Sequence, residues 1–458
     1  MINVIFMLVL SLLTSSFSLA DGLLGDSPRE PSQAADGTTV LYGPDFFVRF
    51  PNTQNAADLV ARIPGGQQVM GSGRGGGGSN RGFSNNNDGI LINGRRITGK
   101  GNNSQSVLRR ITKDQVKHIQ LIRGSSPDIK SASQSAMINV VTKESQSSGS
   151  GTWSVGSLTT DTGYTRPSTK ASYSGKSGNL EYFLSGEYTP DNRNGSMRDE
   201  FYDADDLLTQ AIDFEMATKQ NRVNLSGNMA YKMENGDLLR FNVTFKTGTK
   251  NLERRGRSFL PDAGANLIFD TNTLRLENYK NPNWEIGGDY GKAWSENWTL
   301  KFIGLYVNKG NDSEQRIDNT YDTVTISEDF KSFSSRKSTE AISRLSLSYI
   351  GFKGHDIEFG SEVAINTLNT DLEYLERISG SLQETSINNS ALGVRETRIE
   401  SFINDTWGLS EKATIETILV GEYSEIGITG DANNKRNFFF LKPTLDYRYN
   451  FNPKNQIK

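Results

Sequence analysis

The sequence predicts a mainly β protein, in which a membrane-spanning antiparallel β-barrel follows a small α/β domain at the N-terminus. From about residue 150 onward, segments of roughly ten residues alternate apolar and polar side chains. Short turns and longer polar connections alternate between these segments. An outer-membrane barrel needs an apolar face on every strand, short turns on one side and long loops on the other. A soluble all-β sandwich fits the alternation alone equally well.

The first 20 residues favour the membrane alternative. Residues 2–13 form an apolar run that is too short to span a bilayer, and Ser18-Leu19-Ala20 fits a signal peptidase site, although no Lys or Arg precedes the run. No later hydrophobic stretch has the length of a spanning helix, and the mean hydropathy is −0.54. We therefore predict a signal peptide over residues 1–20, and we exclude a helical membrane protein.

Residues 21–42 have the composition of a disordered segment, rich in Gly, Ser, Pro and acidic residues. The segment ends in a short β-prone run at residues 38–42. A domain over residues 43–145 follows, with a mixed α/β pattern. We expect a short helix over residues 56–63, a strand, turn and strand over residues 89–97, a helix end leading into a strand over residues 115–123, and a strand over residues 137–143.

This domain resembles the plug of TonB-dependent outer-membrane receptors. Five blocks match in the order and spacing of that family, and they are residues 57–65, 81–83, 88–96, 116–124 and 137–143. The segment between Gly124 and Met137 departs from the family, which has Tyr-Gly and Gly-Gly pairs there, and this puts the local turn geometry in doubt. The resemblance covers roughly residues 40–145, and it implies that a barrel follows over residues 146–458.

The resemblance also implies site residues. A family member carries a TonB box that adds a strand to TonB, and the matching run is Thr38, Thr39, Val40 and Leu41; a plain linker strand is the alternative. Arg81 and Arg123 each stand in an Arg-Gly pair and match arginines that latch the plug to barrel glutamates; salt bridges within the plug are the alternative.

A glycine-rich loop lies where the family has the external face of its plug. Residues 71–76 satisfy the pattern G-x-G-x-x-G, but a phosphate cradle needs a preceding strand and a following helix N-terminus, and the sequence continues as a polar loop. We therefore expect no nucleotide site. The candidate ligand-contact residues are Gly73, Arg74, Gly75, Gly76 and Lys100, and a loop without specific contacts is an equal alternative.

In the barrel region, the clearest strand is residues 239–246. Leu239, Phe241, Val243 and Phe245 would face lipid, and the residues between them would face the lumen. Turn sequences at residues 176–179, 234–237, 295–297 and 411–412 suit hairpins. We expect residues 189–219 and 247–271 to form long polar loops.

The number of strands bears on whether the chain is a whole barrel. We expect about twelve strands, whereas plugged transporters have about 22. The residues after Asn452 read as a turn that enters a further strand. From the sequence alone we therefore expect an incomplete barrel and a truncated chain.

Charge differs between the two regions. Residues 43–145 contain 14 basic and 6 acidic residues, whereas residues 146–458 contain 35 basic and 43 acidic residues. A basic plug against an acidic wall explains this difference, and random scatter of surface charge is the alternative. The basic residues are spread rather than clustered, so we expect no nucleic-acid binding.

The composition argues against catalysis. The chain has no Cys and 2 His residues, which leaves little for hydrolytic triads, and we expect no metal site, no cofactor and no enzymatic activity. The resemblance implies a protein of the cell outer membrane that imports a small anionic or metal-chelate ligand, with TonB, ExbB, ExbD and outer-membrane lipid as partners. A ferric siderophore is favoured because a basic cleft attracts anions. The alternatives are importers of glycans, haem or corrinoids, a passive porin or adhesin barrel, and a secreted binding module.

Overall fold

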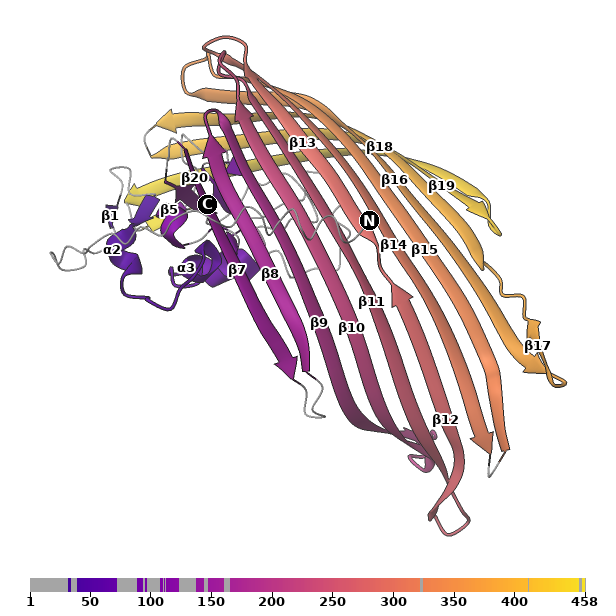
Figure 1. Ribbon diagram of the computed structural model, residues 1–458. Coiled ribbons are helices and arrows are strands. Elements are labelled where there is room, and N and C mark those ends of the chain that lie inside the picture. The colour runs from indigo at the N-terminus through magenta and orange to yellow at the C-terminus, as the bar shows by residue number, and fades with distance from the viewer. Residues whose placement is uncertain are drawn as a thin grey trace.

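The computed structural model contains two β-sheets, one small and one very large (Figure 1). It describes residues 32–33, 39–71, 89–93, 95–96, 108–109, 111, 113–122, 137–143, 147–159, 165–321, 324–410, 412–452 and 455–457. The large sheet, which begins with strand β7 (Ser147–Thr159), is strongly curved in Figure 1. Gln115 of the small α/β domain donates a hydrogen bond to Ser174 of the large sheet, so the two parts are in contact.

The small sheet has the strand order β1-β2-β5-β6-β3-β4. Its strands are β1 (Ser32–Gln33), β2 (Thr39–Tyr42), β3 (Ile90–Ile92), β4 (Arg95–Arg96), β5 (Val116–Ile122) and β6 (Met137–Thr142). Its helices are α2 (Pro44–Phe47), α3 (Ala56–Val60), α4 (Gly66–Gly71) and the 3-10 helix η2 (Lys113–Gln115). The four elements predicted in this region are confirmed, although the helix is shorter than expected.

Helix α3 shows how the small domain forms its core. Asn55 caps the helix, because its side chain accepts a hydrogen bond from the amide of Asp58. The apolar face predicted for this segment is buried, with Leu59 and Val60 at 0% exposure. These side chains pack with Ile90, Ile119, Val140 and others in one cluster. The domain therefore has its own hydrophobic core.

The large sheet is antiparallel. Its strands are β7, β8 (Thr165–Ser177), β9 (Leu180–Tyr202), β10 (Leu208–Lys232), β11 (Leu238–Pro261), β12 (Leu267–Lys280), β13 (Asn283–Ala293), β14 (Trp298–Tyr321), β15 (Val324–Tyr349), β16 (His355–Ile378), β17 (Ser381–Glu384), β18 (Ala391–Ser410), β19 (Ala413–Gly430), β20 (Asn434–Asn452) and β21 (Asn455–Ile457). Strands β17 and β21 are short, and β12 and β13 lie end to end between β11 and β14. The described residues therefore form twelve long strand positions, as predicted.

The two faces of this sheet differ in polarity. Along β11 the apolar side chains point outward, with exposures of 44% for Leu239, 38% for Phe241, 37% for Val243 and 39% for Phe245. Between them, Asn242 and Thr244 are buried at 6% and 3%. Because side chains alternate along a strand, the exposed apolar face is the lipid face, and we call the opposite face the lumen face. The predicted period of two is confirmed.

The hairpin turns lie where turn residues were predicted. Strands β8 and β9 are separated by Gly178 and Asn179, and Gly178 has a φ of 57°, which suits a two-residue hairpin. The connections β10–β11, β13–β14 and β18–β19 also fall at the predicted positions. Among the described residues, no helix is long and apolar enough to cross a membrane.

The prediction of long polar loops is wrong. Residues 189–219 and 247–271 are mostly strand, and only residues 203–207 and 262–266 leave the sheet within them. The polar side chains of these segments pair across strands, as in the ion pair between Arg198 Nη1 and Asp213 Oδ1 at 3.1 Å. The backbone ladder does not depend on side-chain polarity, so a polar composition indicated exposure to solvent and not the end of a strand.

Candidate functional site

A row of three glutamates lies on the lumen face, where β16, β18 and β19 run side by side. Glu362 is directly opposite Glu400, and Glu400 is directly opposite Glu422. All three are buried, Glu362 to 1% exposure. Directly opposed residues have Cβ atoms about 4.5–5.5 Å apart, and like charges at that distance repel. The row therefore requires cations beside it.

Arg398 and Lys442 supply those cations. Arg398 Nη2 lies 2.9 Å from Glu362 Oε1, and Arg398 Nη1 lies 3.1 Å from Glu400 Oε1. Lys442 Nζ lies 3.8 Å from Glu400 Oε1 and also pairs with Glu422. We call these five residues the lumen wall cluster. A buried ion pair is costly to break from one side, because the remaining charge is left without compensation.

Charged pairs continue on both sides of this cluster. On β20, Arg448 Nη2 lies 3.0 Å from Glu416 Oε2, and its Nε lies 2.9 Å from Asp446 Oδ1. At the other end, Arg240 Nη2 lies 2.7 Å from Asp289 Oδ1. The lumen face is thus lined by acidic groups that side-chain cations partly neutralise. Such pairs are strong enough to hold an insert and can be exchanged for others.

In the small domain, the tip of the β3–β4 hairpin is held against β6. Asn93 has a φ of 52°, a conformation that Asn tolerates better than most residues. Its Oδ1 accepts a hydrogen bond of 2.9 Å from the amide of Thr142, and its Nδ2 donates one of 3.0 Å to Thr142 Oγ1. The predicted turn at this position is confirmed, and the side chain of Asn93 ties it to the neighbouring strand.

The candidate TonB box falls within the small sheet. Thr39, Val40 and Leu41 belong to β2, which pairs with β5 on one side and with β1 on the other. Thr38 lies outside the described residues. A strand that is paired on both edges cannot join another sheet until one edge is released. If residues 39–41 belong to a TonB box, β2 must therefore leave the small sheet before it can pair with TonB.

The other predicted site residues lie outside the part of the chain that the structure describes. These are Arg81 and Arg123 of the latch and the loop residues Gly73, Arg74, Gly75, Gly76 and Lys100. The row Glu362, Glu400 and Glu422 is described, and it lies on the lumen face. The sequence contained one signal for this row, namely acidic residues at lumen-facing positions of alternating strands, but their alignment depends on the register between strands.

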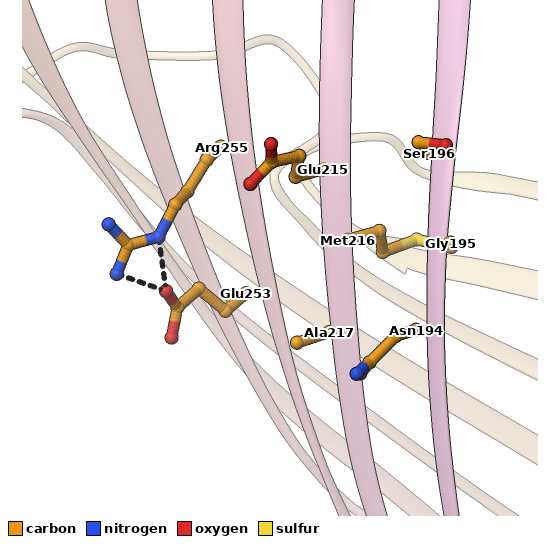
Figure 2. A pocket seen from close by; sticks show the side chains of 8 residues that line it. All are labelled: Asn194, Gly195, Ser196, Glu215, Met216, Ala217, Glu253 and Arg255. Carbon is orange, nitrogen blue, oxygen red and sulfur yellow. Dashed lines mark hydrogen bonds and ion pairs between the residues drawn. The ribbon is translucent and has the colours of Figure 1, made fainter. Parts of the chain in front are cut away.

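A hollow of about 430 Å³ opens on the other face of the sheet (Figure 2). It is lined by Asn194, Gly195, Ser196, Glu215, Met216, Ala217, Glu253 and Arg255. Arg255 and Glu253 form an ion pair of 2.6 Å at its rim. By strand alternation these two side chains share the face of Leu239 and Phe245, so the hollow lies outside the lumen.

Among the described residues, no group of three or more His, Asp or Glu side chains could hold a metal ion. His118 lies in β5, and burial, with a smaller effect of Lys117, lowers the pKa of its imidazole. Both effects favour the neutral imidazole over the charged form.

Comparisons with known proteins agree with this arrangement. Residues 33–137 match the model of the TonB-dependent receptor plug domain. No curated protein matches the chain.

Among solved structures, the chain is similar to a siderophore receptor, a copper transporter and a ferric citrate transporter. The siderophore receptor PiuA from Acinetobacter baumannii has 11% identity and a TM-score of 0.45, over 93% of this chain and 66% of its own. The copper transporter OprC has 12% identity and a TM-score of 0.43, over 94% of this chain and 63% of its own. The ferric citrate transporter FecA has 11% identity and a TM-score of 0.26, over 90% of this chain and 74% of its own. The chain thus spans slightly less than two thirds of the length of the first two receptors.

The plug model covers the small α/β domain, and that domain contacts an antiparallel sheet with an apolar lipid face and a charged lumen face. Both features are those expected of a protein that resides in the outer membrane. The chain therefore contains a TonB-dependent receptor plug domain, matched over residues 33–137.

Proposed function

We propose that this protein serves the active, TonB-dependent import of a scarce ligand across the bacterial outer membrane, and that the ligand is a ferric siderophore. The observation that carries the proposal is the plug domain in one chain with a membrane sheet whose lumen face is charged. A passive porin needs no plug, and a secreted binding module needs no apolar outer face. We propose no enzymatic activity.

The charges on the lumen face support a mechanism in which a pulling force from TonB releases the plug. Ion pairs between a basic plug and an acidic wall hold the plug while no force acts. Force from TonB, supplied by ExbB and ExbD, would exchange these pairs for others and open a path. We propose that Arg81 and Arg123 are the plug side of this latch and that Glu362, Glu400 and Glu422 belong to its barrel side.

Charge also supports the ligand class. The region of residues 43–145 carries 14 basic against 6 acidic residues. A cleft of positive potential concentrates anions at its mouth. Anionic ferric chelates therefore fit better than neutral glycans, while haem and corrinoids remain the competing ligands.

The test of the proposed function is uptake by cells that express this receptor and lack their own siderophore receptors. Labelled ferric siderophores should accumulate only when TonB is present. Accumulation that does not depend on TonB would favour the passive porin. Binding and uptake of glycans in place of ferric chelates would replace the proposed ligand class.

The candidate TonB box makes a specific prediction. In Val40→Pro the backbone loses a donor, and φ is held near −65°. We expect ligand binding at the cell surface to persist while uptake is lost, because the strand can no longer add to TonB. Uptake at the wild-type rate would remove Thr38–Leu41 from consideration.

A cross-linking experiment tests directly whether this segment contacts TonB. The chain has no Cys, so Thr38→Cys introduces a unique thiol. With a cysteine in the periplasmic domain of TonB, a disulfide should form when ligand is bound. If this cross-link is absent while a cysteine at another N-terminal position does form a cross-link, the segment that binds TonB lies elsewhere.

The latch makes a second prediction. Replacing Arg81 and Arg123 together by alanine should loosen the plug, because wall carboxylates would lose cations and repel one another. Entry of large antibiotics through the mutant receptor should rise. Lysine at both positions, which keeps the charge, should restore much of the barrier. If permeability stays the same in the double alanine variant, the arginines act only within the plug.

A further inference from the structure

A second charged cluster lies on the lumen face of strands β11 and β12. On β11 it lies beyond the segment from Leu239 to Phe245, whose apolar side chains face lipid. It comprises Lys250, Arg254, Arg275, Glu277 and Tyr279, and we call it the vestibule cluster. Strand β11 pairs with β10 without a register shift from Leu238 to Phe259. Its even-numbered residues therefore stay on the lumen face along this whole length.

Two arginines of the vestibule cluster oppose each other. Arg254 of β11 is the direct partner of Arg275 in β12. Directly opposed like charges destabilise a strand pair. Such a pair is most stable when an anion lies between or above the two guanidinium groups.

Both arginines are held in position by other contacts. The guanidinium of Arg254 lies 5.2 Å from the ring centre of Phe214, and its Nε is buried without a hydrogen-bond partner. Arg275 Nε lies 2.5 Å from Glu277 Oε1, and its Nη2 donates a hydrogen bond of 3.2 Å to Gln315 Oε1. Lys250 Nζ adds a third cation, 5.3 Å from the ring centre of Tyr279.

The charges of this cluster do not balance. Glu277 is its one carboxylate, and Arg275 and Tyr279 already bind it. The lumen-facing residues that β10 and β14 place beside the cluster are uncharged, namely Phe214, Met216, Thr218, Gln220, Ser313, Gln315 and Ile317. Three cations against one anion leave an excess of two positive charges.

We propose that the vestibule cluster binds an anionic group, a carboxylate or a phosphate, on the ligand before the ligand reaches the plug. Arginine offers planar, paired donors that match both groups. Arg254 supplies the free donors, Arg275 the opposing charge, and Lys250 long-range attraction. The inference rests on the proposed import function and narrows its ligand to molecules with an exposed anionic group.

The test measures binding by the full-length receptor in detergent, with citrate and inorganic phosphate as probes and glucose as a neutral control. We expect Arg254→Met with Arg275→Gln to weaken binding of at least one anion by about tenfold or more, since hydrogen bonds to charged groups are the strong ones. The probe that loses affinity identifies the anionic group. Because TonB is absent, failure here is distinct from failure of TonB-dependent uptake.

Arg255 is a matched control on the same strand, since it points to the opposite face and pairs with Glu253. Arg255→Met should leave binding of both anions unchanged. A double lysine variant at positions 254 and 275 should keep part of the affinity and confirm that the wall is intact. Equal affinity of the wild type and the Met/Gln variant for both probes, or an equal loss in Arg255→Met, would overturn the proposal.

Discussion

Replacing Arg398 by alanine is expected to lower the free energy of unfolding by about 3–5 kcal/mol, the typical cost of breaking a buried ion pair from one side. The side chain of Arg398 is 5% exposed, and those of its partners Glu362 and Glu400 are 1% and 6% exposed. Without Arg398, the row of opposed carboxylates loses its central cation. Repulsion between the carboxylates and their burial away from water then both destabilise the folded state.

The measurement is urea unfolding of the full chain in lipid vesicles, followed by tryptophan fluorescence and by heat-dependent mobility in gels. Arg255→Ala is the control, because its pair with Glu253 is exposed by 67% and 40% and should contribute about 0–1 kcal/mol. Arg398→Met combined with Glu362→Gln and Glu400→Gln should recover most of the loss, since the two cations that remain beside the cluster keep other carboxylates, Arg344 that of Glu358 and Lys442 that of Glu422. A loss as small as that of Arg255→Ala would show that water in the lumen screens the cluster.

Replacing Leu225 by arginine should destabilise the protein by about 2–4 kcal/mol, the cost of a cation on the lipid face near the middle of the membrane. Leu225 is 48% exposed and lies in β10 opposite Phe245 of β11, within the apolar face. A cation there has no partner and no water. Reduced assembly into the outer membrane is the expected result in cells.

Ala230→Arg provides the matched control, because residue 230 lies on the same strand with the opposite face toward the lumen. Its direct partners are Glu181 on β9, which can pair with the new cation, and Arg240 on β11, whose charge Asp289 already neutralises. Unfolding midpoints in vesicles should fall for Leu225→Arg and change little for Ala230→Arg. Equal effects of the two substitutions would contradict the assignment of lipid and lumen faces.

Much of the local structure was predictable because its causes are local. The alternation from Leu239 to Phe245 depends only on the period of a strand, and the turn at Gly178 depends on the backbone freedom of glycine. Helix α3 was predictable because Leu59 and Val60 lie on one face of a short amphipathic segment. The polar segments of β9 to β12 were not, because cross-strand hydrogen bonds and ion pairs extended these strands where composition suggested loops.

The candidate functional residues were less predictable. The family resemblance identified Thr38–Leu41 as a candidate handle, but only the fold showed that β2 is paired on both edges. The opposed pair Arg254 and Arg275 is separated by 21 positions in the sequence and meets only through the register of β11 and β12. No pattern within one strand reveals which side chain of the next strand lies opposite.

By itself, the sequence determined the fold class, the faces of the strands, the position of most turns and the plug region, because period, turn chemistry and motif spacing are properties of neighbouring residues. Only the tertiary structure decided how far each strand extends and which charges meet. Glu362, Glu400 and Glu422 form one row because three strands align in a particular register. That register is set by the summed pairing of whole strands, to which any single residue contributes little.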